Sequence, residues 1–245
     1  MVFAAGLGTR LRPITDTTPK ALVEVGGKPL LYHAICKLRK AGYDDIVVNV
    51  HHYSQQVIDY LAHNDLGVKT AVSDESALLL ETGGGIKHAR PLLEPLTGPF
   101  LVHNVDILSN LDLGWFRAQA RPDALSTLLV SRRETSRYLL FDTDMRLRGW
   151  TNVKTGEVRS PYPAEELEAC MKFAFAGIHN ISPAVFAMME NYPERFPIMD
   201  FYLGECSNHP IYGVVADNLQ MIDVGKLDSL KAAEEFYASF AKNFQ

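Results

Sequence analysis

The first chemistry-bearing feature of the chain is a loop that combines two glycines with three cations. Gly6 and Gly8 follow an apolar run, and three basic residues come next: Arg10, Arg12 and Lys20. Glycines let backbone N–H groups approach a ligand closely, and the cations supply fixed positive charge. The combination predicts a site for a polyphosphate, with a turn carrying solvated arginines as the alternative. The spacing matches neither a dinucleotide fingerprint nor a Walker loop.

A longer segment around this loop resembles the sugar-1-phosphate nucleotidyltransferase family. The family motif reads Ala-Ala-Gly-x-Gly-x-Arg, then Arg-Pro, Pro-Lys and Gly-Lys-Pro, and this chain fills every position. The resemblance implies that Arg10 stabilises departing pyrophosphate and that Lys20 bridges the two reacting phosphates, so both are expected to be catalytic. It also assigns nucleotide binding to the loop residues Ala4, Ala5, Gly6, Gly8, Thr9 and Arg10. As a loop lysine, Lys20 is expected to be exposed.

A second glycine-rich segment begins at Glu81 and contains three consecutive glycines at residues 83–85. We expect them directly before a helix that runs to Leu93, because such a sequence costs backbone entropy unless a ligand approaches the main chain there. A flexible turn is the alternative. Glu-Thr-Gly-Gly-Gly-Ile resembles the N-acetylmuramate-1-phosphate uridylyltransferase branch, in which this segment lies along the nucleotide base. The resemblance therefore adds three nucleotide-binding residues: Thr82, Gly83 and Gly84.

Two aspartates end apolar runs that lie far apart in the sequence. Asp106 follows residues 100–105, and Asp223 ends the run before Val224. An aspartate after a strand is often only a turn former, but the resemblance implies that both carboxylates hold Mg²⁺, which prefers oxygen ligands. Val105 replaces the family's usual glycine and Lys226 its usual threonine, so the turn is bulkier and one phosphate-side or sugar-side contact differs.

The elements that must position these residues follow from the hydrophobic pattern. Apolar runs predict strands at residues 1–5, 46–50, 67–72 and 100–106, and helical spacing predicts helices at residues 29–41 and from Ser54 onward. This alternation predicts an open, mostly parallel α/β sheet with helices on both faces, which the resemblance makes Rossmann-like. His51 and His52 end the second strand, and we expect loop packing there because adjacent strand residues face opposite sides.

From about residue 111 the pattern changes to a smaller, antiparallel part. It predicts a short helix at Trp115, strands at residues 124–132, 138–142, 146–150 and 172–178, and a hairpin of residues 210–216 and 219–224. Residues 151–168 are expected to form a loop or lid. A final amphipathic helix at residues 226–244 has a predicted buried stripe of Leu227, Leu230, Ala233, Phe236, Tyr237 and Phe240.

The resemblance divides this single domain, residues 1–245, into a nucleotide-binding half at residues 1–110 and a sugar-phosphate-binding half at residues 111–245. A Phe-x-Gly-Ile sequence in the second half again resembles the uridylyltransferase branch, where this strand walls the sugar pocket. It implies that Phe175 and Gly177, together with Lys20, bind the sugar phosphate.

Composition narrows the class of protein. The net charge of −5 argues against a general nucleic-acid binder, and a hydrophobic fraction of 47% is that of an ordinary globular chain. Three dispersed cysteines indicate neither a disulfide framework nor a zinc site, which makes a reducing cytoplasm the expected location. We expect no membrane span and no secretory signal, and members of the family typically begin a few residues earlier. The oligomeric state stays open.

Three functions are compatible with these residues. The first is uridylyl transfer from UTP to a sugar 1-phosphate, with N-acetylmuramate 1-phosphate in peptidoglycan recycling as the favoured substrate. The second is the same chemistry with another pair, such as GTP and mannose 1-phosphate. The third is a glycosyltransferase or a non-catalytic nucleotide-sugar-binding subunit, because Asn104 and Asp106 also resemble an Asp-x-Asp motif. Arg10 and Lys20 argue against the third, since it requires neither cation.

Overall fold

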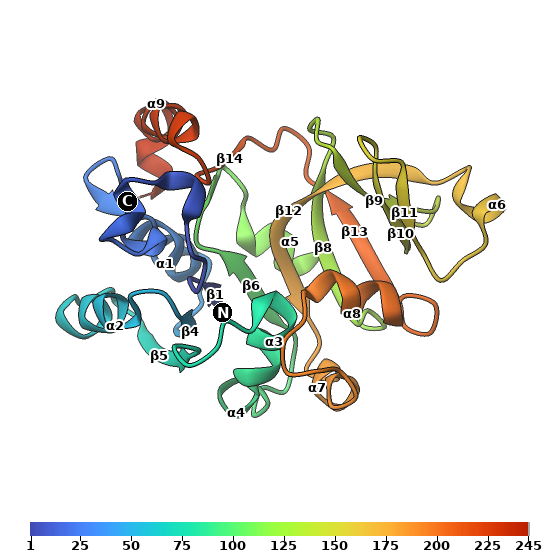
Figure 1. The fold of residues 1–245 in the computed structure, drawn as a ribbon, viewed down its shortest axis with the longest axis horizontal. Coiled ribbons are helices and arrows are strands. Elements are labelled where there is room, and N and C mark those ends of the chain that lie inside the picture. Colours follow the sequence, from blue (N-terminus) through green and yellow to red (C-terminus); the bar gives the residue numbers. More distant parts are fainter. Residues whose placement is uncertain (245) are drawn as a thin grey trace.

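The computed structural model describes the backbone of residues 1–244 and the side chains of residues 1–239. Within these residues, ten strands form one large twisted sheet with helices on both faces (Figure 1). The strand order along its main path is β11-β10-β9-β12-β6-β1-β4-β5, and β8 and β13 join beside β12. The predicted α/β architecture is confirmed.

The first part of the chain supplies the parallel strands of this sheet. They are β1 (Val2–Phe3), β4 (Asp45–Val50), β5 (Lys69–Asp74) and β6 (Phe100–Asn104). The helices between them are α1 (Leu30–Lys40), α2 (Ser54–His63), α3 (Glu81–His88) and α4 (Arg90–Leu93). Leu31 and Ile35 of α1 are fully buried, as helical spacing predicted, while basic residues occupy its last turn, where they complement the helix dipole.

The second part adds the antiparallel strands. The central one, β12 (Met171–Ile181), runs antiparallel to β6 and to β8 (Ser126–Ser131), and β13 (Ile211–Val215) runs parallel to β8. At the far end lie β9 (Arg137–Phe141), β10 (Leu147–Asn152) and β11 (Glu157–Arg159). The helices here are α5 (Leu113–Ala118), α6 (Ala164–Leu167), α7 (Val185–Met189) and α8 (Ile198–Glu205).

Residues 151–168 are more regular than predicted. β10 continues to Asn152, β11 pairs with it at the edge of the sheet, and α6 follows. The expectation of a loop over this whole segment was therefore wrong. The strand could not be predicted because β11 is an exposed edge strand. None of its three residues is buried, so the usual alternation of buried and exposed residues is missing.

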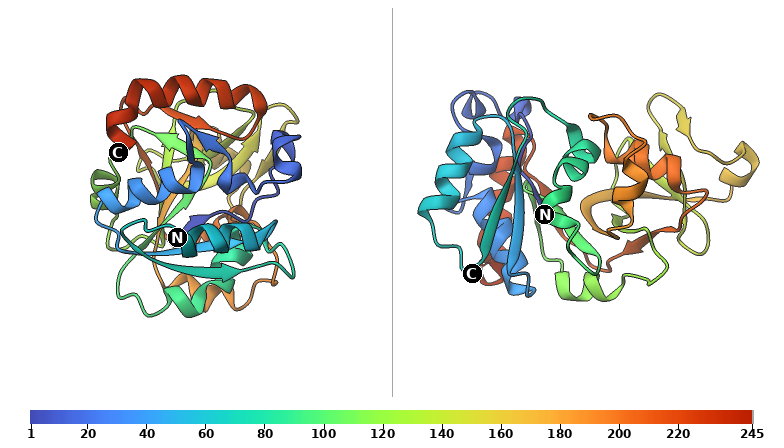
Figure 2. Two further views of the ribbon diagram at one scale, coloured as in Figure 1. Left: turned by 90° about the vertical axis from the view of Figure 1, so that its left-hand side faces the viewer. Right: turned by 90° about the horizontal axis from the view of Figure 1, so that it is seen from below.

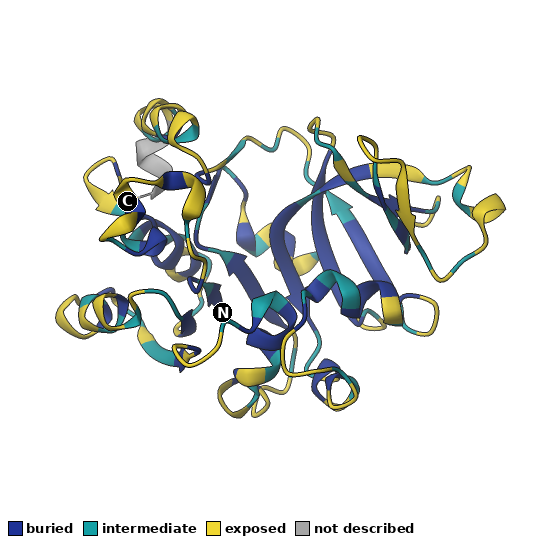
Figure 3. Ribbon diagram, in the orientation of Figure 1, coloured by how far each residue is buried: buried dark blue, intermediate teal, exposed yellow. Residues whose placement is uncertain are grey.

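Two hydrophobic cores lie on opposite faces of the sheet. The first is packed under α1 and α2 and includes Leu31, and the second lies under α3, α7 and α8 and includes Phe201. The central strands between the two cores are buried and drawn in dark blue, whereas the outer surfaces of the surrounding helices are exposed (Figure 3). Burying both faces explains why the central strands read as continuous apolar runs.

The predicted hairpin near the C-terminus does not form. β13 pairs with β8 in the large sheet, whereas β14 (Met221–Asp223) pairs with β7 (Ile107–Ser109) in a separate two-stranded sheet. Asn218 does adopt a left-handed turn conformation, with φ of 57°, so the turn signal was correct locally. Strand pairing is decided by distant partners, and the crossing carries Asp223 to the strand that follows Asp106.

The last helix, α9 (Leu227–Phe244), packs across α1 and the small strand β2 (Glu24–Val25), which pairs with β3 (Lys28–Pro29) (Figure 2). Ala233 is fully buried, and Leu230, Phe236 and Tyr237 pack against the first core. Leu227 is exposed, contrary to prediction, and Phe240 lies outside the described side chains. No helix among the described residues combines the length and apolar character that a membrane span requires.

Candidate active site

The loop after β1 adopts a compact, ligand-accessible conformation. Gly8 has φ of 64°, its carbonyl accepts hydrogen bonds from Leu11 N at 2.8 Å and Thr15 Oγ1 at 2.8 Å, and Gly6 is exposed. A Cβ at Gly8 would lie 2.8 Å from Thr15 Cγ2, so both the backbone angle and the packing require glycine there. Arg10 and Thr9 are exposed on the same loop. The predicted phosphate-binding groups are thus accessible together.

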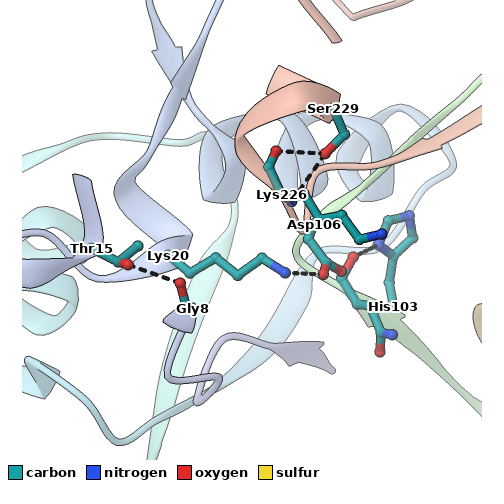
Figure 4. Close-up of polar contacts among 8 residues, drawn as sticks. Gly8, Thr15, Lys20, His103, Asp106, Lys226 and Ser229 are labelled. Carbon is teal, nitrogen blue, oxygen red and sulfur yellow. Dashed lines mark hydrogen bonds and ion pairs between the residues drawn. The ribbon is translucent and has the colours of Figure 1, made fainter. Parts of the chain in front are cut away.

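Lys20 extends from this loop to Asp106 and forms an ion pair with it (Figure 4). The two side chains are only 11% and 17% exposed. Lys20 is therefore buried, and the expectation of an exposed loop lysine was wrong. The reason is tertiary: the lysine starts a short 3-10 turn directly behind Gly8, and its stem packs under the glycine loop.

Asp223 reaches the same place from β14. The pairing of β14 with β7 sets Asp223 opposite Ile107, and Val224 N donates to Asp106 O at 2.9 Å. Arg10 completes the group, because a Cβ placed on Gly225 would lie 2.9 Å from its Nη2 and 2.7 Å from Asp223 Oδ1. Four predicted residues from four segments therefore converge: Arg10, Lys20, Asp106 and Asp223.

The electrostatics of this group favour a cation between the carboxylates. Although Asp223 reaches solvent, the protein atoms around it raise the pKa of its carboxyl group, as does the neighbouring Asp106, while Lys20 and Arg10 act in the opposite direction. Two carboxylates this close repel one another when both are ionised. The pair therefore offers oxygen donors that a second positive charge would stabilise.

The described residues contain no cluster of three or more histidine, cysteine, aspartate or glutamate side chains that could hold a metal. Asp106 and Asp223 nevertheless fit Mg²⁺, because this ion is commonly held by one or two carboxylates together with substrate phosphates. Val105 is buried in the first core, so the bulky residue at this turn points inward and leaves the Asp106 side chain free to face Lys20.

Beside the charged group lies a cavity of about 420 Å³. Six of the predicted residues line it: Ala4, Ala5, Gly6, Lys20, Thr82 and Asp106. Thr82 Oγ1 also accepts a hydrogen bond from Ile198 N at 2.9 Å, which ties α3 to α8. Glu81 and Asn104, which belong to the two motifs named in the sequence, also line it, and three further lining residues were not singled out from the sequence: Phe3, Asn49 and Glu75.

Asn49 and Glu75 form a buried link across this cavity. Asn49 Nδ2 donates to Glu75 Oε1 at 2.7 Å, and Asn49 Oδ1 accepts from Ala4 N at 2.8 Å. Glu75 Oε2 accepts from Leu80 N at 3.3 Å, and burial raises the pKa of the Glu75 carboxyl group. The only sequence signal was a polar residue at the end of an apolar strand, which is unusual because buried polar groups need partners.

The glycine triplet lies inside α3, not before a helix as predicted. The N–H groups of Gly83 and Gly84 both donate to Phe196 O, at 2.9 and 3.0 Å. A Cβ at Gly84 would lie 2.3 Å from Glu194 O, so the missing side chains admit this neighbouring segment. Close packing of two chain segments is what the geometry shows for these glycines, and their contact with a nucleotide stays a prediction.

Phe175 and Gly177 lie on β12 where its register shifts. Gly177 has φ of 75°, and a Cβ there would lie 2.8 Å from Asn104 Nδ2, which places Gly177 against the end of β6 near Asp106. Phe175 is half-buried and packs edge-on against His179, with ring centroids 5.4 Å apart. His51, by contrast, bonds Glu75 O through Nδ1 at 2.6 Å, as expected of loop packing.

Several known proteins are similar to this chain in sequence. An N-acetylmuramate alpha-1-phosphate uridylyltransferase of Neisseria meningitidis serogroup B is 44% identical over 132 residues, 53% of this chain and 56% of that protein. Its counterpart in Caulobacter vibrioides is 49% identical over 109 residues, 43% of this chain and 44% of that protein. A mannose-1-phosphate guanyltransferase of Kluyveromyces lactis is 29% identical over 209 residues, 81% of this chain and 55% of that protein. The matches span about half the length of these relatives.

Solved structures share the fold over nearly the whole chain. HddC from Yersinia pseudotuberculosis, complexed with GMP-PN, has a TM-score of 0.76 at 23% identity and covers 96% of this chain and 97% of its own. A putative glucose-1-phosphate thymidylyltransferase from Bacillus anthracis has a TM-score of 0.81 at 18% identity, with coverages of 99% and 97%. The family model described as nucleotidyl transferase matches residues 1–160. This chain therefore belongs to the nucleotidyl transferase family.

Proposed function

We propose that this protein transfers a uridylyl group from UTP to N-acetylmuramate 1-phosphate, releasing pyrophosphate. The observation that carries the reaction class is the convergence of two cations and two carboxylates beside one cavity: Arg10, Lys20, Asp106 and Asp223. Both substrates are highly anionic, so the enzyme must neutralise their repulsion and align a phosphate oxygen with the α-phosphorus. Little proton transfer is needed, because a phosphate monoester is already ionised near pH 7.

The cations divide this task. Arg10 and the N–H groups of Gly6 and Gly8 would hold the β- and γ-phosphates and stabilise pyrophosphate as its bond to the α-phosphorus breaks. Lys20 lies deeper, behind the glycine loop, and would contact the α-phosphate and the attacking sugar phosphate. Its pairing with Asp106 holds the ammonium group in position before substrate binds, which limits the entropy lost on binding.

Asp106 and Asp223 would hold Mg²⁺. When bound, the ion neutralises charge on the α-phosphate and helps to align it. The carboxylates themselves must be ionised to do this. The hydrogen bond from Val224 N to Asp106 O holds together the two segments that carry them. On this proposal residues 1–110 bind the nucleotide, and residues 111–245 complete the sugar-phosphate side with Phe175 and Gly177.

The choice of UTP and N-acetylmuramate 1-phosphate rests on the two uridylyltransferase relatives, and it would place the enzyme in cytoplasmic peptidoglycan recycling. The mannose-1-phosphate guanyltransferase relative is more distant but spans more of the chain. Guanylyl transfer to mannose 1-phosphate is therefore the second candidate.

The test is a screen of the four nucleoside triphosphates against a panel of sugar 1-phosphates, with pyrophosphate release as the readout. We expect release only when both substrates and Mg²⁺ are present, and the highest rate with UTP and N-acetylmuramate 1-phosphate. The highest rate with GTP and mannose 1-phosphate would support the second candidate. Transfer from a nucleotide sugar to an acceptor alcohol, with no pyrophosphate release from any pair, would instead identify a glycosyltransferase.

A further inference from the structure

A second cavity, of about 730 Å³, lies at the carboxyl-terminal ends of β8 and β13. The end of β8 contributes Ser131, followed by Arg132 and Arg133. The linker from β13 to β14 forms the opposite wall together with Met221, the first residue of β14, and Phe236 of α9 closes one side. Because β8 and β6 both run antiparallel to β12, this cavity opens at the same edge of the sheet as Asp106.

Two connections link the cavity to the charged group, one along β14 and one through Arg133 and β12. Met221 lines it and lies two residues before Asp223 on β14, so both side chains leave the same face of the strand, about 7 Å apart. On the other side, Arg133 Nη2 donates to Phe175 O at 3.1 Å. Phe175 is two residues from Gly177, which abuts Asn104. A sugar whose phosphate is held at Lys20 would therefore direct its ring substituents toward this cavity.

Ser131 shows that the cavity is built for a polar group. Its hydroxyl is buried, with the residue 8% exposed, and has no hydrogen-bond partner within the described part of the chain. Strand alternation sets Ser131 on the same face as Leu129, which belongs to the core against which Met221 and Phe236 pack, so the side chain lies on the side of β8 where the cavity is. An unpaired buried hydroxyl is unfavourable, and a bound acceptor would give it a partner.

The charge of the lining selects the kind of acceptor. Arg132 and Arg133 outnumber the one acidic residue of the lining, Asp217. Arg133 uses one nitrogen for the Phe175 carbonyl, which fixes the guanidinium group and leaves further donors of its fork available. The planar set of N–H donors in a guanidinium group matches the two oxygens of a carboxylate better than it matches a hydroxyl or an amide.

We propose that this cavity receives a carboxylate-bearing substituent of the sugar 1-phosphate, with Arg133 as the specificity-determining residue and Ser131 as a second donor. The proposal rests on the proposed function and deepens it, because it explains which sugar 1-phosphates the site prefers. A neutral sugar would leave the remaining donors of the Arg133 guanidinium group and the buried Ser131 hydroxyl without an anionic partner.

The test compares kcat/KM for N-acetylmuramate 1-phosphate and N-acetylglucosamine 1-phosphate, which differ by one carboxylate-bearing ether group. In Arg133→Gln we expect kcat/KM for the acidic sugar to fall at least tenfold, as loss of a charge-assisted hydrogen bond requires, and kcat/KM for the neutral sugar to change by less than about twofold. Ser131→Ala should show the same selectivity with a smaller effect. The matched control is Lys69→Gln, which removes an exposed cation from β5 and should alter neither substrate.

Equal losses for both sugars in Arg133→Gln would overturn the proposal, because they would mean that the arginine only supports the Phe175 carbonyl. Unchanged kinetics with both sugars would overturn it as well. If no sugar 1-phosphate releases pyrophosphate, the proposed function fails on its own. Calorimetry with N-acetylmuramate 1-phosphate then tests the inference by binding alone. We expect Arg133→Gln to bind it at least tenfold more weakly than the wild type, and equal affinities would overturn the proposal.

Discussion

Replacing Lys20 by methionine is expected to lower both the activity and the stability of this protein. Methionine keeps much of the apolar stem that packs behind Gly8 but removes the charge that pairs with Asp106. In the variant, Asp106 would lie next to Asp223 with its nearest cation gone. The repulsion that already raises the pKa of Asp223 would then act without compensation from Lys20.

The size of the effect follows from the burial of the pair. Removing one partner of a fully buried ion pair costs about 3–5 kcal/mol, because the other charge is left desolvated. Lys20 and Asp106 keep 11% and 17% of their side-chain exposure at a cleft, so we expect a smaller loss, roughly 1–3 kcal/mol. Turnover should fall about a hundredfold or more, since each ~1.4 kcal/mol of barrier is tenfold in rate.

Urea unfolding at pH 7 measures the first quantity and pyrophosphate release the second. The double variant Lys20→Met/Asp106→Asn should recover most of the lost stability but none of the activity, because the stranded charge is gone. Added Mg²⁺ should raise the unfolding midpoint of Lys20→Met more than that of the wild type, since the ion supplies the missing charge. The exposed Lys69→Met serves as the control and should shift stability by less than about 0.5 kcal/mol. A stability of Lys20→Met within 0.5 kcal/mol of wild type would refute the reasoning.

Three further predictions concern other parts of the structure. Asp106→Asn and Asp223→Asn should each raise the Mg²⁺ concentration for half-maximal activity, and their losses of kcat should be strongly non-additive; additive losses would mean that they do not share one ion. Gly84→Ala should lower the free energy of unfolding by about 1–3 kcal/mol, because its Cβ would meet Glu194 O at 2.3 Å, whereas Gly98→Ala, in open space, should change it by less than about 0.5 kcal/mol in the same urea titration. Burial lowers the pKa of His179 to about 3, so the unfolded chain binds the extra proton below pH ~6.5 and stability falls as pH falls. Between pH 7.5 and 5.5 this residue should account for about 1.4 kcal/mol of lost stability, and a His179→Gln variant with the wild-type pH dependence would contradict the assignment.

The sequence by itself determined the family resemblance and the main architecture. The spacing of Gly6, Gly8, Arg10 and Lys20 is a local feature of the sequence. It therefore indicates a phosphate-binding loop without any knowledge of the tertiary structure. The continuous apolar run of β4 likewise indicated a strand buried on both faces, which the structure confirms. Periodicity within one element can be read from the sequence because it depends only on which faces are buried.

Tertiary structure decided how these pieces meet. The pairing of β14 with β7 instead of β13 brings Asp223 to Asp106, and no local pattern contains that information, because strand pairing depends on partners more than a hundred residues apart. The glycine triplet reads as a loop, since glycine is a poor helix former, but the Phe196 segment packs so closely against α3 that only glycine fits. Burial of Lys20 has the same origin: its environment is built by the glycine loop before it and by Asp106 from the turn between β6 and β7, so it exists only in the folded chain.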